Sequence, residues 1–375
     1  MNNKKNIVLF SNTLWFFEKF KFELIENLNN KYNVYCLFLK DGPPVDLARI
    51  NKLKKKGVQF QSLTFYVAVK LITRINFNLG LNYKPSLNPD KVVVFTIGPI
   101  LLSGFIFFKY RKVTTYVLEG LGRVFVSRKI IYRFLKRLLV AFYKILFSGC
   151  NSVITLNYSD AIYLAEMNIS TIDKIKVIPG TGIDVGLINN RISSGEFNPK
   201  YIDFMARLIA EKGIYKFVYL RLNLLKYYPH IANQYKFRII TPQSDINLIS
   251  NSEKKYLNSL GIILKPYIDD PFQYYVSSKV IVVPTNYGEG ISRVALEAAY
   301  IGIPLLLSKN RGTEDILPIN YKYFIKSDNP NIITLQLVDI LKDQKYFEKI
   351  NPEIKNLIES RYTTNESIRA FNCSI

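Results

Sequence analysis

A strand–helix–strand pattern late in the sequence constrains the fold more than any other feature. An apolar run, Val280–Pro284, precedes the stretch Tyr287–Pro304, which reads YGEGISRVALEAAYIGIP, and a second apolar run, Leu305–Leu307, follows it. Short aliphatic and β-branched runs on both sides of a helical pattern are typical of a parallel sheet. With 375 residues, the chain is long enough for two α/β domains or slightly more.

The turn before the predicted helix combines glycines with a carboxylate. Gly288, Glu289 and Gly290 form it, and Glu297 follows about two helical turns later. Small residues let backbone N–H groups approach a ligand, and a helix N-terminus favours an anion. Two carboxylates would repel a phosphate but suit the hydroxyl groups of a sugar or a ribose. A nucleotide-sugar combines these needs; an ordinary amphipathic helix with two solvated glutamates is the alternative.

The form GEGxSRxxLEAxxxGxP, which includes Gly302 and Pro304, resembles the retaining GT-B glycosyltransferases of family 4. Within that family it resembles the branch that builds bacterial O-antigens, capsules and exopolysaccharides. The resemblance implies an α/β chain with two Rossmann-like domains facing across a cleft. It also implies transfer of a sugar, with retention, from a nucleotide-sugar that we expect to be UDP-linked. The implied acceptor is a saccharide on a polyprenyl diphosphate, in lipopolysaccharide or other surface polysaccharide biosynthesis.

The resemblance assigns donor-side roles to residues after the predicted strands of the second domain. Arg207 and Lys212 would grip the donor diphosphate, because cations there neutralise charge that grows on the leaving group. Glu289 would hold the sugar hydroxyls and Glu297 the ribose. The loop with Tyr267 would hold the nucleobase, and the remaining donor-binding positions are Gly290, Ile291, Ser292 and Arg293. No metal or other cofactor is expected.

The resemblance also assigns acceptor-side residues in the first domain. The segment EGLGR, with Glu119, Gly120, Gly122 and Arg123, resembles the loop that places catalytic and acceptor groups. Other family members carry His or Asp near Glu119, and a glycine turn that ends a strand with its charge in water is the alternative. Asn12 follows the first predicted strand, where it either contacts substrate or caps the next helix.

Motif positions give the domain limits. The segment PGTGID, 179–184, resembles the point at which the family passes from its first domain to its second. We therefore expect an acceptor-side domain at 1–185 and a nucleotide-sugar domain at 186–350. A helical segment at 351–375 would cross back to the first domain. Asn157 and Asp160 are expected to cap a helix in the first domain.

The net charge of +22 indicates either an anionic partner or, in part, a background composition rich in Lys, Asn and Ile. No nucleic-acid motif accompanies it, so an anionic membrane surface is the preferred partner. Residues 128–147 separate into an apolar half and a basic half that holds Lys129, Arg133, Lys136, Arg137 and Lys144. Such a helix either lies on a membrane or packs its apolar half in the core. The polyprenyl-linked acceptor favours a cytoplasmic enzyme bound peripherally to the inner membrane, on its cytoplasmic face.

Several other patterns limit the possibilities. The uncharged stretch 92–108 is broken by Gly98 and Pro99, so a buried strand and a helix explain it better than a membrane span. The N-terminal basic residues lead directly into a strand pattern, so no signal peptide is expected. Three widely spaced cysteines fit a reducing compartment, and one histidine argues against a His-ligated metal site. Two other functions remain open: a sugar-nucleotide epimerase or hydrolase with this fold, and a non-catalytic partner in a polysaccharide assembly complex.

Overall fold

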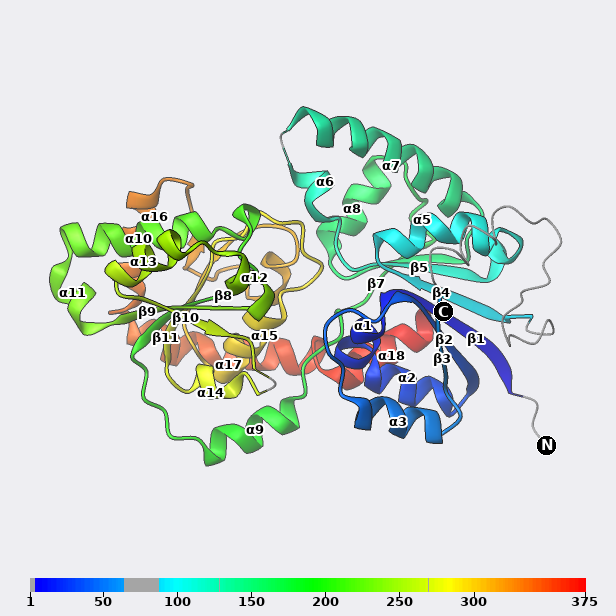
Figure 1. Ribbon diagram of the computed structural model, residues 1–375, viewed down its shortest axis with the longest axis horizontal. Helices are drawn as coiled ribbons and strands as arrows, with labels where there is room; N and C mark the ends of the chain where they lie inside the picture. Colours follow the sequence, from blue (N-terminus) through cyan, green and yellow to red (C-terminus); the bar gives the residue numbers. More distant parts are fainter. Residues whose placement is uncertain (1–3, 64–87, 128, 269) are drawn as a thin grey trace. The chain divides into compact units, whose positions relative to one another are not determined.

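The computed structural model describes residues 4–63, 88–127, 129–268 and 270–375 (Figure 1). The chain forms two compact units. The first unit holds residues 1–181 and 364–375, and the second holds residues 182–363. Each unit is built around one parallel sheet, as the strand–helix–strand pattern predicts.

The first unit contains a seven-stranded sheet in the order β3-β2-β1-β4-β5-β6-β7. Every pairing in this sheet is parallel. The order reverses between β1 and β4, which places the topological switch point there. The strands are β1 (Lys5–Thr13), β2 (Tyr32–Lys40), β3 (Gln59–Ser62), β4 (Lys91–Phe95), β5 (Thr114–Leu118), β6 (Ser152–Thr155) and β7 (Ile175–Val177).

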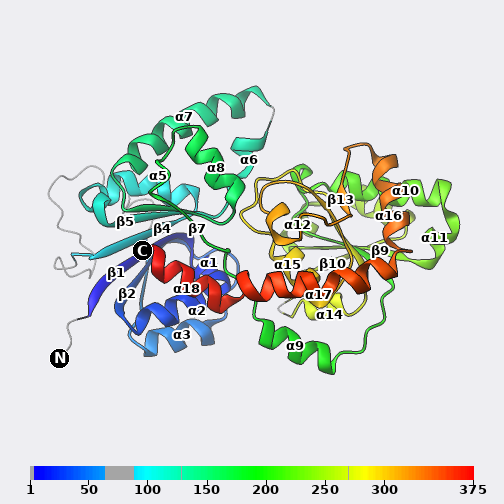
Figure 2. The same ribbon diagram turned by 180° about the vertical axis from the view of Figure 1, so that it is seen from behind.

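Helices cover both faces of this sheet, which is why its strands read as nearly continuous apolar runs (Figures 1 and 2). One face carries α1 (Leu14–Phe20), α2 (Phe22–Asn29), α3 (Leu47–Lys55) and α18 (Thr364–Ser374). The other carries α5 (Ile97–Ile106), α6 (Gly122–Val126), α7 (Ile130–Ser148) and α8 (Tyr158–Glu166). A 3₁₀ helix, η1 (Phe108–Val113), joins α5 to β5.

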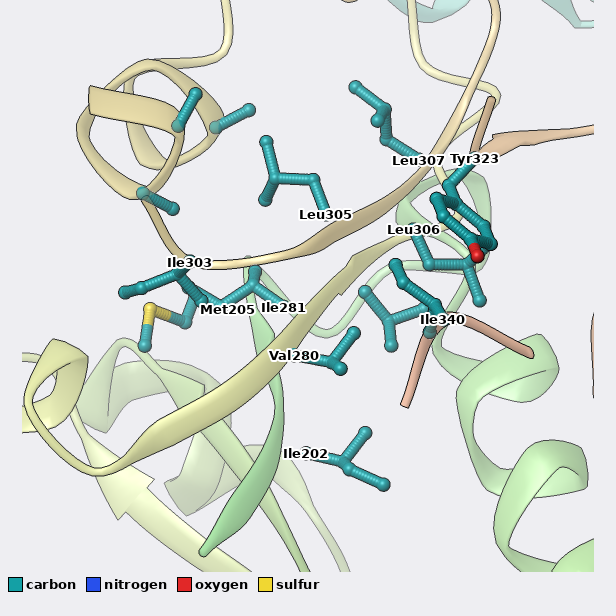
Figure 3. Close-up of a cluster of buried hydrophobic side chains, with 14 of the residues drawn as sticks. Ile202, Met205, Val280, Ile281, Ile303, Leu305, Leu306, Leu307, Tyr323 and Ile340 are labelled. Carbon is teal, nitrogen blue, oxygen red and sulfur yellow. The ribbon is translucent and has the colours of Figure 1, made fainter. Parts of the chain in front are cut away.

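The second unit repeats this topology with six parallel strands in the order β10-β9-β8-β11-β12-β13. Its switch point lies between β8 and β11. Aliphatic side chains from these strands form the core (Figure 3), for example Ile202, Val280 and Leu305. The strands are β8 (Tyr201–Met205), β9 (Lys236–Thr241), β10 (Ile262–Pro266), β11 (Ser278–Val283), β12 (Leu305–Ser308) and β13 (Phe324–Ile325).

Helices again lie on both faces. One face carries α10 (Ile214–Tyr227), α11 (Pro229–Gln234), α13 (Asn251–Ser259) and α16 (Pro330–Ile340), and the other carries α14 (Phe272–Tyr275), α15 (Arg293–Ile301) and α17 (Gln344–Arg361). The remaining elements are α9 (Val185–Ser194), α12 (Gln243–Leu248), η2 (Ala210–Lys212) and η3 (Glu314–Ile316).

The chain returns to the first unit later than the sequence motifs predict. Residues 351–363 stay in the second unit, because α17 runs on through Pro352 and buries Ile354 and Ile358 in the second core. Only α18 belongs to the first unit, where the ring of Phe371 stacks on Phe95 with 6.2 Å between centroids. The forward division falls between Thr181 and Gly182 rather than near residue 185.

Among the local predictions, those for residues 92–108 and for Asn157 are confirmed, and the capping alternative for Asn12 is not. The uncharged stretch 92–108 is β4 followed by α5, as expected, and none of the described helices is long and apolar enough to span a bilayer. Asn157 caps α8, accepting a hydrogen bond from the N–H of Asp160 at 2.7 Å. Thr13, not Asn12, caps α1, accepting from the N–H of Phe16 at 3.0 Å. The capping alternative for Asn12 is therefore wrong; Asn12 lies within β1.

Candidate active site

A cavity of about 300 Å³ opens at the switch point of the second unit. The loops after β8 and β11 and the start of α15 line it, together with a residue that follows β10. Parallel sheets bind ligands at this place, at the carboxyl ends of the strands beside a switch point. Six of the predicted donor-side residues line this switch-point pocket: Arg207, Lys212, Tyr267, Glu289, Ser292 and Arg293.

An ion pair between the two loops lies in the pocket. Nζ of Lys212 is 2.6 Å from Oε1 of Glu289, and the two side chains are 17% and 14% exposed. The ammonium also lies 5.0 Å from the ring centroid of Tyr287. Lys212, after β8, and Glu289, after β11, thus neutralise each other. The ammonium can form charge-assisted hydrogen bonds with phosphate groups of a ligand, and the carboxylate can form them with hydroxyl groups.

Arg207 is the second cation of the pocket. Its Nε is 3.5 Å from Oδ2 of Asp245, a longer contact than that of Lys212, and its side chain is 63% exposed. Asp245 is buried and also accepts a hydrogen bond from the N–H of Leu208 at 2.9 Å. Asp245, which sequence reasoning missed, therefore fixes the loop after β8 while leaving the guanidinium accessible.

Two glycines allow the pocket loops to meet. Gly213 has φ +85°, and a Cβ there would lie 2.2 Å from the carbonyl oxygen of Pro284. Gly312 has φ +81°, and its Cβ would lie 2.4 Å from the carbonyl oxygen of Glu289. No other residue type fits either position, because the backbones approach too closely and the φ is left-handed. Gly213 directly follows Lys212, which the motifs singled out, but only the fold shows what each glycine touches.

The N-terminus of α15 also faces the pocket. Ser292 is the N-cap, accepting from the N–H of Ala295 at 3.4 Å, and its own N–H donates to the carbonyl of Gly312 at 3.3 Å. Gly290 and Ile291 precede the cap and are not among the lining residues. The positive end of the helix dipole favours an anion here.

Glu297 is not among the lining residues, but its carboxylate contacts Arg293, which is. Its Oε1 accepts from Nε of Arg293 and its Oε2 from the hydroxyl of Tyr275, both at 2.8 Å. Burial, and next the carboxylate of Glu297, raise the pKa of Tyr275 well above its usual value. The phenol therefore keeps its proton and its hydrogen bond at neutral pH. Sequence reasoning missed Tyr275, because no spacing rule links it to Glu297.

Tyr267 directly follows β10 and lines the pocket. Its backbone N–H donates to the carbonyl of Thr241 at 2.9 Å, which fixes the loop. Loss of water around the phenol, and next the carboxylates of Asp245 and Glu289, raise the pKa of Tyr267. The neutral phenol is thus held beside both acidic groups. Asp269, in the same predicted loop, lies outside the described residues.

The predicted acceptor-side residues lie in the first unit, also at the carboxyl edge of its sheet. Glu119 follows β5 and pairs with Lys21 at 2.8 Å. Gly120 and Gly122 adopt φ 123° and 68°, so the turn needs glycine at both positions. Arg123 lies in α6, half-buried. Within the described residues, no group of three or more His, Cys, Asp or Glu side chains is placed to hold a metal ion.

Comparison with known proteins agrees with this geometry. Residues 189–357 match the family model described as Glycosyl transferases group 1, and no curated protein matches the sequence. Among solved structures, Anabaena Alr3699/HepE in complex with UDP and glucose has a TM-score of 0.74 at 13% identity, covering 99% of both chains. A glycosyltransferase from Rickettsia africae has a TM-score of 0.71 at 15% identity, covering 99% of this chain and 98% of the other.

A sucrose-phosphate synthase from Thermosynechococcus elongatus is similar too, with a TM-score of 0.70 at 14% identity and coverage of 99% and 98%. Likeness at such low identity shows the fold, which is GT-B. The family match falls within the unit that holds the switch-point pocket. The chain therefore has the GT-B fold, and the match of residues 189–357 to the group 1 family model supports a glycosyltransferase.

Proposed function

We propose that this protein is a retaining glycosyltransferase that uses a UDP-sugar as donor. The observation that carries the proposal is the switch-point pocket, where Arg207, Lys212 and the α15 N-terminus meet Glu289. Three sources of positive charge suit a diphosphate, and a carboxylate in the same pocket suits sugar hydroxyls. The similar structure of Anabaena Alr3699/HepE in complex with UDP-glucose supports a UDP-linked donor.

Residues in the pocket and directly behind it have distinct roles in this proposal. Arg207 and Lys212 stabilise the negative charge that develops on the departing diphosphate, without a metal ion. Glu289 accepts hydrogen bonds from the sugar hydroxyls, and Lys212 orients it. Glu297 binds the ribose hydroxyls, held in place by Tyr275. Donor binding must loosen the Lys212–Glu289 pair, because the phosphate and the sugar compete for its two ends.

We assign the acceptor to a saccharide on a polyprenyl diphosphate, in surface polysaccharide synthesis at the cytoplasmic face of the inner membrane. Support comes from α7, whose predicted start at Arg128 lies outside the described residues. Its core-packing alternative is wrong for most of the apolar half. Ile131, Phe134, Leu138 and Ile145 are 53–68% exposed, and only Tyr143, Leu146 and Phe147 are buried.

The exposed residues of α7 follow a helical spacing and so form one stripe. Arg133, Arg137 and Lys144 are exposed beside it, whereas Lys136 turns inward and lies 5.1 Å from the ring centroid of Tyr163. An apolar stripe flanked by basic side chains is the pattern of a helix that lies in an anionic membrane interface. A polyprenyl-linked acceptor would enter from that interface.

A donor panel tests the enzymatic half of the proposal. Purified protein is titrated calorimetrically with UDP, GDP and dTDP, and then incubated with the corresponding sugars. We expect UDP to bind and one UDP-sugar to be turned over, with the product anomer, read by NMR, matching the donor. Failure of every nucleotide to bind would contradict the proposal. Turnover onto a soluble sugar phosphate instead of a lipid-linked saccharide would leave the donor assignment standing and remove the acceptor assignment.

A further inference from the structure

The carboxyl edge of the first-unit sheet carries a charged pair that the switch-point pocket does not use. Oε1 of Glu119 lies 2.8 Å from Nζ of Lys21. The Lys21 side chain is only 3% exposed, whereas that of Glu119 is 21% exposed. The pair therefore has a buried positive end and an acidic end that reaches the surface, just after β5.

Lys21 reaches this place because the helix breaks there. Sequence periodicity predicts one helix from about Trp15 to Asn29, yet α1 ends at Phe20 and α2 begins at Phe22. Between them Lys21 adopts φ −127° and ψ 8°, outside the helical region. Two helices thus replace one, and the side chain at the break points toward the sheet edge.

The surroundings of the Lys21 ammonium are aromatic. It lies 5.3 Å from the ring centroid of Phe16 and 5.0 Å from that of Phe95. Ring faces attract a cation, but a buried ammonium still costs free energy unless a carboxylate pairs with it. Glu119 supplies that carboxylate. An apolar residue at position 21 would fill the same space more cheaply, which indicates that the charge serves a purpose beyond packing.

Backbone strain marks the same edge. Thr96, directly after β4, has φ 66° and ψ 155°, a region that is almost restricted to glycine. Its Oγ1 is buried and has no hydrogen-bond partner within the described residues. β4 and β1 flank the point where the strand order reverses, and ligands bind parallel sheets there. A strained residue with an unsatisfied hydroxyl is a further sign of a ligand-binding edge.

We propose that Lys21 is a positioning residue that fixes Glu119 to receive a hydroxyl group of the acceptor sugar. The turn Glu119–Gly122 contains two glycines, so an unpaired Glu119 would sample several orientations. Lys21 holds Oε1, and the exposed part of the carboxylate remains to accept a charge-assisted hydrogen bond. The inference rests on the proposed function, since it gives that transferase its acceptor-side anion.

A double-variant cycle in the full chain tests the inference. The variants are Lys21→Met, Glu119→Leu and the two combined, each examined for melting temperature, for UDP affinity by calorimetry and for sugar transfer. Transfer is measured with a panel of UDP-sugars and synthetic polyprenyl-diphosphate-linked saccharides. The exposed pair Lys56–Glu26, whose atoms lie 2.5 Å apart, provides a matched control cycle in the same unit, where we expect little change because exposed pairs contribute little.

We expect Glu119→Leu, which leaves a buried ammonium unpaired, to lower the melting temperature by about 5–15 °C. The double variant should recover most of this loss. Transfer should nevertheless fall about ten- to hundredfold in all three variants, including the stable double variant, as for one lost charge-assisted hydrogen bond. UDP affinity should stay unchanged.

A double variant that regains both stability and transfer would make the pair purely structural and overturn the inference, while leaving the transferase intact. A wild-type chain that binds UDP but transfers to none of the acceptors would overturn the inference and the acceptor assignment together. A wild-type chain that binds no UDP would overturn the proposed function itself. The three readouts therefore separate these failures.

Discussion

The two units share a strand order but differ in what they place at the switch point. In the second unit the loops after β8 and β11 enclose a cavity with Lys212 and Glu289 paired inside it, both partly exposed. In the first unit the cation of the corresponding edge, Lys21, is buried, and only the carboxylate of Glu119 reaches the surface. The shared topology therefore determines the sheet edge at which polar side chains lie. Local features, such as the break between α1 and α2 at Lys21, determine which charge is accessible to a ligand.

The outer surfaces of the units differ as well. On the first unit, α7 exposes an apolar stripe with basic neighbours. On the second, α10 exposes tyrosines, Tyr215, Tyr219 and Tyr227 among them, which carry a polar tip and need no apolar partner. Under the proposed function, membrane contact would belong to the first unit and binding of the soluble donor to the second. The following predictions test that division, starting with the largest expected effect.

Lys212→Met should abolish most sugar transfer. Removing one group that stabilises charge on the leaving diphosphate costs about 10²–10³ in rate. The control is Lys216→Met: its ammonium also lies 2.6 Å from a carboxylate, that of Asp328, and its side chain is likewise 17% exposed. Steady-state rates with the preferred UDP-sugar decide the matter. Equal losses in both variants would show that the pocket cation has no special role.

Charge reversal on α7 should release the protein from anionic vesicles. Each basic side chain near an anionic surface contributes about 1 kcal/mol, so Arg133→Glu, Arg137→Glu and Lys144→Glu together should weaken binding about a hundredfold or more. Sedimentation with vesicles of anionic lipid, at low and high salt, measures the effect. The matched control reverses Lys226, Lys254 and Lys255 on the second unit, where binding should persist.

The apolar stripe of α7 can be tested on its own. Phe134→Ser with Leu138→Ser should weaken vesicle binding in high salt, where screening has removed most of the electrostatic attraction. Binding that depends only on charge would leave this variant like wild type. A wild-type chain that stays in the supernatant with anionic vesicles at low salt would remove the membrane assignment and leave the acceptor to be sought among soluble sugars.

Glu297→Gln should weaken UDP binding about tenfold, as for one charge-assisted hydrogen bond of about 1.5 kcal/mol. Glu359 offers a matched control, because it too accepts from a tyrosine, Tyr300, at 2.7 Å, away from the pocket. Calorimetry with UDP and with uridine compares the variants. Unchanged UDP affinity in Glu297→Gln would contradict the assignment of Glu297 to the ribose. The assignments of Glu289 and of the diphosphate-binding cations would not be affected.

The sequence predicted the fold, with its parallel sheets, because the fold depends on local patterns. The glycine turn with Glu289 is recognisable from local spacing, whereas Ser292 and Arg207 were assigned by the resemblance to a known family. Other features depend on contacts between distant segments. The break at Lys21 and the buried Asp245 have no local signal, since each is decided by a partner far away in the chain.

The prediction for α7 shows the same limit. The helical wheel separated apolar from basic residues correctly, but it could not tell which half faces the core. The packed face is centred on Tyr143 and Phe147, and Lys136 turns with it. Periodicity measures only the difference between two faces of a helix. The neighbouring elements, here α5 and α6, decide which face is buried.

The smallest expected effect concerns metal ions. If Arg207, Lys212 and the α15 N-terminus neutralise the leaving diphosphate, EDTA should leave transfer nearly unchanged, and added Mg²⁺ or Mn²⁺ should change it by less than about twofold. The assay compares wild type with Arg207→Met, where one cation is gone. Partial rescue of that variant by Mg²⁺ would support the charge account, because a divalent ion can replace a missing guanidinium beside a diphosphate. Loss of wild-type transfer on chelation, restored by Mg²⁺, would instead mean that the second unit neutralises its ligand with a bound cation, and the contrast between the two switch points would then rest on the carboxylates alone.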